Sequence, residues 1–530
     1  MTTHINIADF SAPGATPAIP AIFPVSAASN LPLDETSPAL FDVPLPDIRE
    51  LAALKTPQPA SASHAYYFLE DAPPSLPGGI KVPVTHPEPG REAFSAGQAI
   101  PGQAFDVHAI RRDFPALAET VNGRPLVWLD NAATTQKPQA VIDRLAYFYA
   151  HENSNIHRAA HELAARATDA FEAARETVRR FVNARSVNEI VFVRGATEGI
   201  NLVAQSWGRQ TLRSGDEILI TWLEHHANIV PWQQLAAQTG AVLKVAPVND
   251  CGEVRLDEYA KLLGPKTRLV AFTQVSNALG AVTPAAELTR LAHACGAKVL
   301  IDGAQSVSHL RTDVQALGCD WFVFSGHKVF GPTGIGALYG REDLLNASDP
   351  WQGGGNMIQD VTFERTLYQD APARFEAGTG NIADAVGLGA ALEYVDRIGI
   401  DNIARHEHEL LRYGARLLSE IPGLKIIGQA AEKAGVLSFV LDGYDTVAIG
   451  GALNKEGIAV RAGHHCAQPI LRRFGLEATV RPSLALYNTH ADLDALAAAV
   501  WKIVRAGKAD VDVERSSFIS GARPFARPQE

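Results

Sequence analysis

The sequence predicts an α/β protein whose core is a mainly parallel β-sheet of seven strands. Short apolar runs rich in β-branched residues recur along residues 189–339, and helical stretches separate most of them. Polar or glycine-rich segments follow the ends of several runs, as at 194–201 and 302–306. Near-continuous apolar strands that alternate with helices are typical of a parallel sheet covered on both faces.

The predicted elements follow one another in a regular order. Strands are expected at 189–193, 217–221, 242–248, 268–274, 298–301, 321–324 and 335–339, and a long helix at 161–183 precedes them. After about Ala383 the pattern changes. Helices at 384–398 and 403–421, strands at 436–441 and 460–461 and a helix near 492–506 indicate a smaller α+β domain.

Four regions are predicted along the chain. Residues 106–383 form a large domain, with 106–124 packing on the small domain, which is 384–507; residues 508–530 form a tail. Residues 1–105 hold 17 of the 32 prolines and show no sustained helix or strand period, so we expect this extension to be disordered. Its two apolar islands, 17–25 and 39–48, suit a docking segment, and an inert tail is the alternative.

Composition and charge exclude several kinds of partner. The formal net charge of the 530-residue chain is −11 and no basic run occurs, so neither nucleic acid nor an anionic membrane is an expected partner. No apolar run approaches the ~18 residues needed to cross a bilayer, and the first lysine or arginine is Arg49. We therefore expect a cytoplasmic protein without a signal peptide. Four scattered cysteines predict neither a disulfide framework nor a CxxC zinc site.

Lys328 follows an apolar run and enters a glycine-rich turn beside Ser325 and His327. A lysine becomes a nucleophile when partial desolvation favours its neutral amine, and a carbonyl cofactor such as pyridoxal phosphate can then condense with it. A solvated lysine at a strand end would show the same local pattern. The residues at the other predicted strand ends decide between these interpretations.

Those residues fit the same cofactor. Asp302 could keep a pyridine nitrogen protonated, His225 could stack on the ring, and Gln305 could donate to O3′. After the first strand, Gly195 permits a tight turn, and Thr197 is expected to cap a helix whose N–H groups bind a phosphate. Each residue also has a structural explanation, such as a cap or a surface histidine, but their order along the chain favours the cofactor site.

Seven motifs in this order identify a family. They are LDNAATTQKP at 129–138, RGATEGIN at 194–201, EHHAN at 224–228, DGAQ at 302–305, SGHK at 325–328, RAGHHCA at 461–467 and RPSLALYN at 481–488. Together they resemble the class V, fold-type I pyridoxal-phosphate enzymes, specifically the SufS-like (group II) cysteine desulfurases and selenocysteine lyases. The resemblance covers about residues 106–507.

The resemblance implies a role for each cofactor residue. Lys328 is the Schiff-base lysine, with Asp302 at the pyridine nitrogen, His225 on the ring, Gln305 at O3′, Asn277 near the ring and substrate carboxylate, and Thr197, Ser325 and His327 on the phosphate. Thr379 is implied to reach the phosphate across a dimer interface. Family members often carry two hydroxyl residues in the phosphate turn, whereas this chain has Ala196 before Thr197. One side-chain contact to the phosphate is therefore expected to be lost, while the backbone donors remain.

Cys466 resembles the sulfur acceptor of the family. Glycine permits a mobile loop around it, and Arg461 and the adjacent histidines favour the thiolate. A metal site made of His464, His465 and Cys466 is the alternative, although three consecutive residues seldom converge on one ion.

Arg481 offers a planar fork for the α-carboxylate of a substrate, and an ion pair within the small domain is the alternative. Arg461 and His157 resemble residues of the family's substrate pocket. The implied function is a cysteine desulfurase that converts L-cysteine to L-alanine and passes the sulfur from a Cys466 persulfide to a protein or thiol acceptor.

Three alternatives stay open at this point. Selenocysteine lyase shares every motif, a class V aminotransferase would not need Cys466, and a non-catalytic, scaffold-docked protein would not need Lys328, Asp302 and His225. The family also implies a homodimer and a place in iron–sulfur cluster assembly. Some SufS-like desulfurases carry disordered extensions for loading into encapsulin shells, and residues 1–105 resemble them in composition and position.

Overall fold

The computed structural model describes residues 105–157 and 161–507. The predictions for residues 1–104, with their two apolar islands, and for the tail at 508–530 fall outside the described residues. None of the helices in the described ranges has the length and apolar character needed to span a membrane.

A seven-stranded sheet is the central element, which confirms the predicted α/β fold. Five strands from β5 to β9 pair in parallel with their neighbours, while β10 is antiparallel to both β9 and β4. The chain from β9 to β10 is too short for the helical crossover that a parallel pair requires, which explains the single reversed strand. The order across the sheet is β4 (Ile190–Val193), β10 (Gly336–Gly340), β9 (Trp321–Ser325), β8 (Lys298–Asp302), β7 (Thr267–Thr273), β5 (Glu217–Thr221) and β6 (Val242–Ala246).

Both faces of this sheet are buried, because alternate residues of each strand enter different cores. In β8, Val299 and Ile301 belong to one apolar cluster and Leu300 belongs to the other. The first cluster includes residues of α2 (Gln139–His151), α3 (Glu162–Phe181), α7 (Leu256–Leu262), α8 (Ala285–Ala294), α9 (Val314–Leu317) and α11 (Ile382–Ile398). The second includes residues of α4 (Ala196–Val203), α6 (Val230–Thr239) and α10 (Glu342–Asn346). A short π-helical segment joins α4 to α5 (Arg209–Thr211).

The C-terminal third contains a second, antiparallel sheet with its own apolar cluster. Its strand order is β13 (Leu424–Ile426), β14 (Phe439–Leu441), β17 (Thr479–Arg481) and β16 (Arg461–Gly463). The cluster also takes in residues of α12 (Ile400–Ser419), α13 (Thr446–Lys455) and α15 (His490–Ala506). Helix α14 (Gln468–Arg473) follows β16, so the segment between them lies between the second sheet and the first core. The predicted domain boundary at 383–384 falls inside α11 and stays a prediction.

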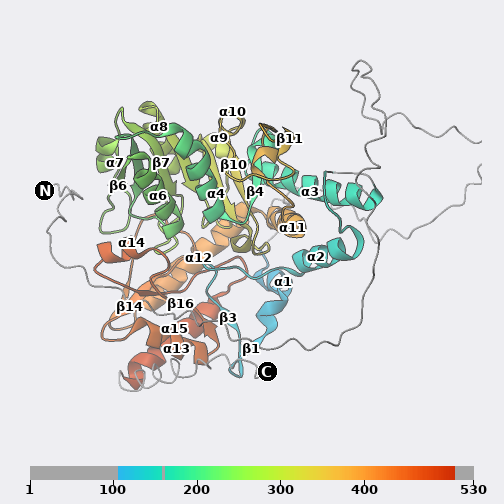
Figure 1. Cartoon of the computed structure of the whole chain (residues 1–530). Helices are drawn as coiled ribbons and strands as arrows, with labels where there is room; N and C mark the ends of the chain where they lie inside the picture. Colours follow the sequence, from blue (N-terminus) through green and yellow to red (C-terminus); the bar gives the residue numbers. More distant parts are fainter. Residues whose placement is uncertain (1–104, 158–160, 508–530) are drawn as a thin grey trace, which may run out of the picture. The chain divides into compact units, whose positions relative to one another are not determined.

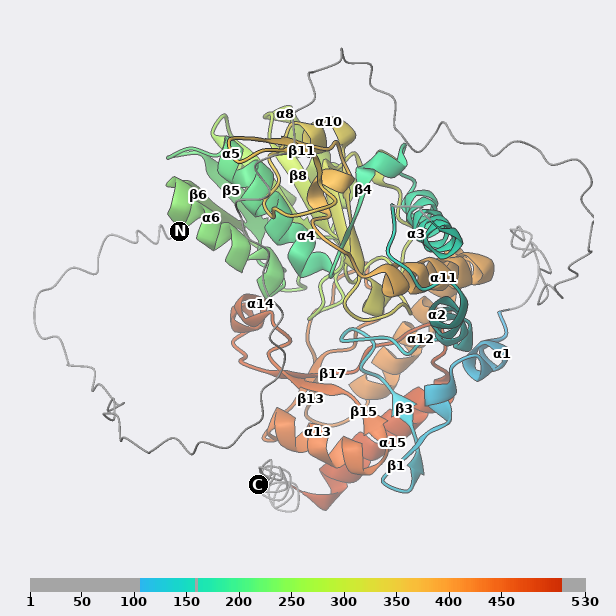
Figure 2. The same cartoon turned by 45° about the vertical axis from the view of Figure 1, so that its right-hand side comes forward.

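The N-terminal described segment joins this second sheet region. Strand β3 (Val127–Trp128) pairs in parallel with β15 (Ile458–Ala459), and both views show the blue N-terminal strands beside the red and orange C-terminal elements (Figures 1 and 2). Arg111, on α1 (Val107–Arg112), forms an ion pair with Asp492 of α15 at 3.2 Å. Two hairpins complete the described elements: β1 (Thr120–Val121) with β2 (Arg124–Pro125), and β11 (Ile358–Val361) with β12 (Thr366–Tyr368).

Candidate active site

A cavity of about 320 Å³ lies where the carboxyl ends of the central strands meet the β16–β17 region. This is the edge of an open α/β sheet at which ligands bind. All the predicted site residues line it except Thr379 and His157. Those that line it are Ala196, Thr197, His225, Asn277, Asp302, Gln305, Ser325, His327, Lys328, Arg461, Cys466 and Arg481.

Lys328 ends the 3₁₀ turn that directly follows β9. Burial lowers the pKa of its amine to about 8, and the Asp302 carboxylate opposes that effect. At neutral pH a lysine with such a pKa is uncharged in a useful fraction of molecules, whereas an ordinary lysine is almost fully protonated. The site therefore provides an amine that can act as a nucleophile or accept a proton.

The peptide group before Lys328 is held by several donors. The carbonyl oxygen of His327 accepts hydrogen bonds from the Thr135 N–H at 3.0 Å, the Thr134 hydroxyl at 3.0 Å and Lys137 Nζ at 3.2 Å. Burial lowers the pKa of Lys137 to about 8. Sequence reasoning quoted this segment within a motif but gave these three residues no role. They fix the backbone from which Lys328 projects.

The first turn of α4 faces the cavity through Ala196 and Thr197. The expectation that Thr197 caps this helix is wrong, because the N-cap is Gly195 and Thr197 lies inside the first turn. Gly195 has a φ of +153°, and a Cβ there would lie 2.9 Å from Ser325 Oγ. Ser325 Oγ instead accepts a hydrogen bond from the Ala196 N–H at 2.9 Å. The remaining N–H groups and the helix dipole make this end suitable for an anion.

Asp302 and His225 lie in the cavity wall with opposite ionisation tendencies. Burial raises the pKa of Asp302, whose carboxylate accepts a hydrogen bond from the Ala304 N–H at 2.9 Å. Burial lowers the pKa of His225 to about 3, and its Nδ1 accepts from the Ala227 N–H at 3.1 Å. The His225 ring is therefore neutral at physiological pH. Gln305 donates through Nε2 to the Ala132 carbonyl at 2.7 Å.

Glu224 is a fully buried carboxyl group behind this wall that sequence reasoning missed. It accepts hydrogen bonds of 2.6 Å from both the Thr221 hydroxyl and Asn228 Nδ2. Burial raises its pKa to about 8. Its neighbour His225 was predicted because an aromatic ring suits a cofactor, whereas nothing in the sequence distinguishes a buried glutamate from an exposed one.

Cys466 is exposed at the mouth of the cavity, in a backbone that is fixed on both sides. His465 and Cys466 have φ values of +53° and +54°, in the left-handed region. The Cys466 carbonyl accepts from the His226 N–H at 2.8 Å, and the His465 carbonyl accepts from Asn277 Nδ2 at 2.7 Å. These contacts hold the backbone on both sides of Cys466 in this structure, and the mobility of the loop stays a prediction. Within the described residues, no group of three His, Cys, Asp or Glu side chains is arranged to hold a metal.

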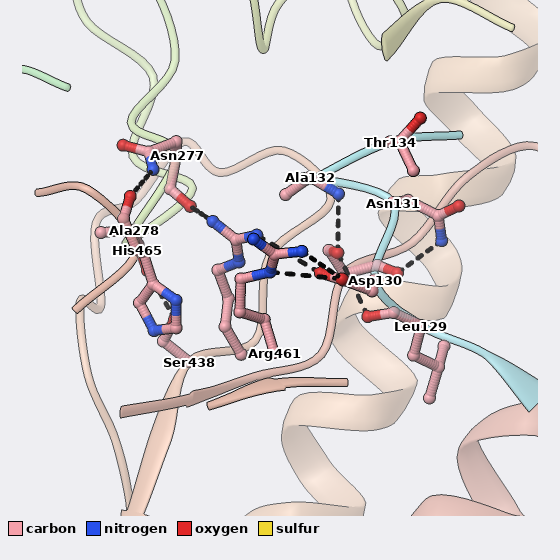
Figure 3. A network of polar contacts seen from close by, with 12 residues as sticks. Leu129, Asp130, Asn131, Ala132, Thr134, Asn277, Ala278, Ser438, Arg461 and His465 are labelled. Carbon is pink, nitrogen blue, oxygen red and sulfur yellow. Dashed lines mark hydrogen bonds and ion pairs between the residues drawn. The ribbon is translucent and has the colours of Figure 1, made fainter. Parts of the chain in front are cut away.

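Arg481, Arg461 and Asp130 form a charged network beside Asn277 (Figure 3). Arg481 is only 2% exposed and donates through Nη1 to the Asn277 carbonyl at 2.9 Å. Burial lowers its pKa to about 10, so the guanidinium remains charged at neutral pH. Asp130 was not predicted as a site residue, although it lies within a quoted motif.

Two predicted residues lie elsewhere. Thr379 lines a second cavity of about 490 Å³, together with Arg194, Glu198 and Asn381. His157 has a φ of +60° and places Nε2 at 2.9 Å from Glu172 Oε1, a hydrogen bond that raises its pKa. Within a single chain neither residue reaches the cavity that contains Lys328.

The cavity fits pyridoxal phosphate by its chemistry. It combines a lysine of lowered pKa, a buried carboxyl group, a neutral histidine ring and a helix N-terminus. Three buried polar atoms of cavity residues, Asn277 Oδ1, His465 Nδ1 and Arg481 Nε, have no hydrogen-bond partner among the described residues. Unpartnered buried polar atoms are costly, so they indicate that a polar ligand belongs beside them.

Known proteins resemble this chain in sequence and fold. The family model described as "Aminotransferase class-V" matches residues 127–496. The chain is 62% identical over 499 residues to a cysteine desulfurase of Synechococcus elongatus, a match that covers 93% of this chain and 80% of the relative. It is 50% identical over 406 residues to a cysteine desulfurase of Dickeya dadantii, covering 76% of this chain and 98% of the relative.

Solved structures show the same fold. The cysteine desulfurase CsdA of Escherichia coli superposes with a TM-score of 0.71 at 40% identity, covering 76% of this chain and 100% of CsdA. A mutant of C-DES, with glycine covalently linked to its pyridoxal-phosphate cofactor, superposes with a TM-score of 0.63 at 25% identity. That match covers 73% of this chain and 98% of C-DES.

Proposed function

We propose that this chain, which belongs to the aminotransferase class-V family, is a pyridoxal-phosphate-dependent cysteine desulfurase. In this proposal the enzyme forms a persulfide on Cys466. The observation that carries the proposal is that Lys328, Asp302, Arg481 and Cys466 line one cavity. Identities of 62% and 50% to cysteine desulfurases support the same activity.

Each side of the cavity would hold one part of the cofactor. Lys328 would bind its aldehyde carbon, Asp302 would pair with the pyridine nitrogen, and His225 would cover the ring. The first turn of α4 at Ala196 and Thr197 would hold the phosphate together with Ser325 and His327, through the N–H groups that the Ser325 hydroxyl leaves free. Gln305 would contact O3′. When bound, pyridoxal phosphate supplies an electron-accepting ring that stabilises negative charge at Cα of an amino acid.

Lys328 is proposed to remove and return protons at Cα. Its pKa of about 8 makes the neutral amine available as a base near neutral pH, and its protonated form is acidic enough to return the proton. Arg481 and Arg461 are proposed to hold the α-carboxylate, with Asn277 beside them. These contacts orient Cα toward Lys328 and the substrate sulfur toward the mouth of the cavity.

Cys466 is proposed to take the sulfur. Its thiolate attacks the sulfur of bound L-cysteine, an S–S bond forms, and the bond from that sulfur to Cβ breaks with its electron pair remaining on carbon. Protonation of that carbon gives L-alanine. The persulfide then passes its outer sulfur to an acceptor thiol, on a small molecule or a protein.

The finer assignments are part of the same proposal. The motifs support a SufS-like enzyme that serves iron–sulfur cluster assembly in the cytoplasm. Thr379 is proposed to contact the phosphate bound by a second copy of the chain, and its place in a different cavity from Lys328 supports a homodimer. Residues 1–105 are proposed to dock the enzyme to an encapsulin shell, and His157 is proposed to act in the substrate pocket.

The test is a product assay on the purified holoenzyme. With L-cysteine as substrate, alanine and sulfide are measured with and without an added thiol. We expect equal amounts of both products when the thiol is present, and alanine without free sulfide in the first turnover when it is absent. Transfer of the amino group to a keto acid, without sulfide, would refute the proposal in favour of an aminotransferase.

A further inference from the structure

The two arginines proposed to hold the substrate carboxylate are direct neighbours across a strand pair. Strands β16 and β17 are antiparallel, and their register places Arg461 opposite Arg481. Like charges directly opposite each other destabilise a sheet. Burial of Arg481 makes the repulsion stronger, because little water separates the two guanidinium groups.

Asp130 offsets this repulsion by presenting one oxygen to each arginine. Its Oδ2 accepts from Arg461 Nη2 at 3.0 Å and Nε at 3.3 Å, and its Oδ1 lies 3.5 Å from Arg481 Nη2. The segment that carries Asp130 is fixed, since the Leu129 carbonyl accepts from the Ser483 N–H at 2.7 Å and the Ala132 N–H donates to Ser483 Oγ at 2.8 Å. Figure 3 shows the Asp130 side chain beside that of Arg461, joined to it by dashed lines.

One edge of the buried Arg481 guanidinium lacks strong partners within the described part of the protein. Nη1 is bound to the Asn277 carbonyl, but Nε has no partner among the described residues and Nη2 is held only by the 3.5 Å contact. Nε and Nη2 form the edge of a guanidinium that binds a carboxylate through two parallel hydrogen bonds. Arg461, by contrast, is half-exposed, and among the described residues its guanidinium is paired with Asp130, which keeps it turned toward Arg481.

We propose that Asp130 is a positioning residue for substrate binding, an inference that rests on the proposed function. It holds Arg461 beside Arg481 so that both can contact one α-carboxylate. Two guanidinium groups and one aspartate leave a single positive charge, which matches the single negative charge of an amino-acid carboxylate. Without Asp130, Arg461 turns toward solvent and the substrate loses one of its two cationic contacts.

The test uses Asp130→Asn, which keeps the size of the side chain and removes its charge. We expect the KM for L-cysteine to rise about tenfold, as for loss of one charge-assisted contact, while kcat changes by less than about threefold. The dissociation constant of L-alanine, measured on the holoenzyme by calorimetry, should rise by the same factor. Asp442→Asn, which breaks an exposed ion pair with Lys425, is the control and should leave both constants unchanged.

A double variant tests whether Asp130 acts through Arg461. In Arg461→Met the KM should already be raised, and adding Asp130→Asn should raise it little further. The double variant should also be more stable than Asp130→Asn alone, because one of the repelling charges is gone. If Asp130→Asn does not fold, the double variant can still be compared with Arg461→Met. Three results would each overturn the proposal. They are additive increases in KM in the double variant, unchanged L-alanine binding in Asp130→Asn, and a fall in kcat equal to the fall in kcat/KM. Absence of turnover by the unaltered enzyme would refute the desulfurase activity but not the role of Asp130. The two can be separated because L-alanine binding is measured without turnover.

Discussion

Desolvation is the largest influence on the pKa of Lys328, His225 and Asp302 alike. It favours the neutral form of each group, which makes the lysine and histidine less basic and the aspartic acid less acidic. The opposite charges of Lys328 and Asp302 then act against that trend in both groups. A bound ring with a protonated nitrogen would strengthen the ionised form of Asp302 further.

Lys328→Ala is expected to abolish covalent cofactor binding, because the amine that condenses with the aldehyde is removed. The rate of alanine formation should fall by at least ~10²–10⁴-fold, the usual value of a positioned base. The visible absorbance of the dialysed protein and its rate with L-cysteine are the measurements. Lys433→Met is the matched control: burial also lowers the pKa of Lys433 to about 8, but it does not line the cavity. Normal turnover by Lys328→Ala would contradict the assignment.

Cys466→Ala is expected to keep cofactor and substrate binding and to lose sulfur transfer, because only the acceptor thiol is removed. The absorbance of the cofactor and its change on addition of L-cysteine should resemble those of the unaltered enzyme, while alanine and persulfide are not formed. Cys251→Ala, which removes another exposed cysteine outside the cavity, should behave like the unaltered enzyme. Alanine release at the normal rate from Cys466→Ala would assign the sulfur to a different acceptor.

His465 should make the protein less stable in acid. Burial lowers its folded-state pKa to about 3, whereas an unfolded histidine titrates near 6.5, so between these values the unfolded chain binds a proton that the folded chain does not. The free energy of unfolding should therefore fall with decreasing pH across this window, by up to about 1.4 kcal/mol per pH unit for this group. His225 and His327, with pKa values of about 3 and 4, act in the same direction.

His465→Gln should make this slope shallower without removing it, and urea unfolding between pH 4 and 7 is the measurement. The glutamine can still bond Thr479, whose hydroxyl lies 2.7 Å from His465 Nε2. Above pH 7 the curves of the two proteins should run parallel, since histidine is neutral in both states there. Identical slopes below pH 6.5 would show that His465 is protonated in the folded protein.

At the scale of elements, the close contact between the end of β8 and β9 determines which residue can follow Asp302. A Cβ added at Gly303 would overlap the ring of Phe322, a fully buried residue of β9. We expect Gly303→Ala to lower the free energy of unfolding by about 1–3 kcal/mol, because neither strand can move away within a packed sheet.

Urea unfolding of the Gly303→Ala protein measures this cost. Gly264→Ala provides the comparison, because no described heavy atom lies within 4 Å of the added Cβ and its φ is not positive. Its stability should change by less than about 1 kcal/mol. A Gly303→Ala protein as stable as Gly264→Ala would mean that the Phe322 ring can rotate out of the way.

The strands of the central sheet could be predicted because local patterns determine them. The run at 217–221 is strand β5 with the same bounds, and each other run overlaps its strand. Boundaries depend on contacts that the sequence does not display. The run at 242–248 was expected to extend to Val248, but β6 ends at Ala246, and Val248 forms an isolated bridge with Val254 instead.

The residues of the cavity could be predicted only where a strand end or a motif marks them. Asp302 ends strand β8, Lys328 and His225 lie a few residues after strands β9 and β5, and all three line the same cavity. Asp130 lies within a quoted motif, but its role could not be predicted, because its partners Arg461 and Arg481 lie 331 and 351 positions later in the chain. Thr197 was expected to be a cap from its residue type, but Gly195 fits the positive φ at that position and Ser325 supplies the hydroxyl.

At the scale of the whole molecule, the proposed docking extension should be separable from catalysis. In the part of the chain that the structure describes, the cavity lining and the buried members of the apolar clusters lie between Phe114 and Ile503. We therefore expect a chain without residues 1–100 to retain its cofactor and its rate with L-cysteine. It should no longer co-purify with an encapsulin shell protein.

A full-length chain in which residues 19–25 and 40–48 are replaced by glycine and serine is the matched control for chain length. It should lose shell association in the same way, since the apolar islands are the proposed contacts. Loss of cofactor or of folding in the truncated chain would show that the extension belongs to the catalytic body.

If Cys466 carries the transferred sulfur, as proposed, the hydrogen bonds to the carbonyl groups of His465 and Cys466 also limit how that sulfur can leave the enzyme. A thiol whose two neighbouring peptide groups are hydrogen-bonded cannot move far outward, so the acceptor thiol must approach Cys466 at the mouth of the cavity. Small thiols can approach such a sulfur directly, whereas a globular protein needs its own cysteine on a narrow, extended segment that fits the mouth of the cavity. Among protein acceptors, the rate of sulfur transfer should therefore depend more on the shape of the segment that carries the cysteine than on the reactivity of its thiol.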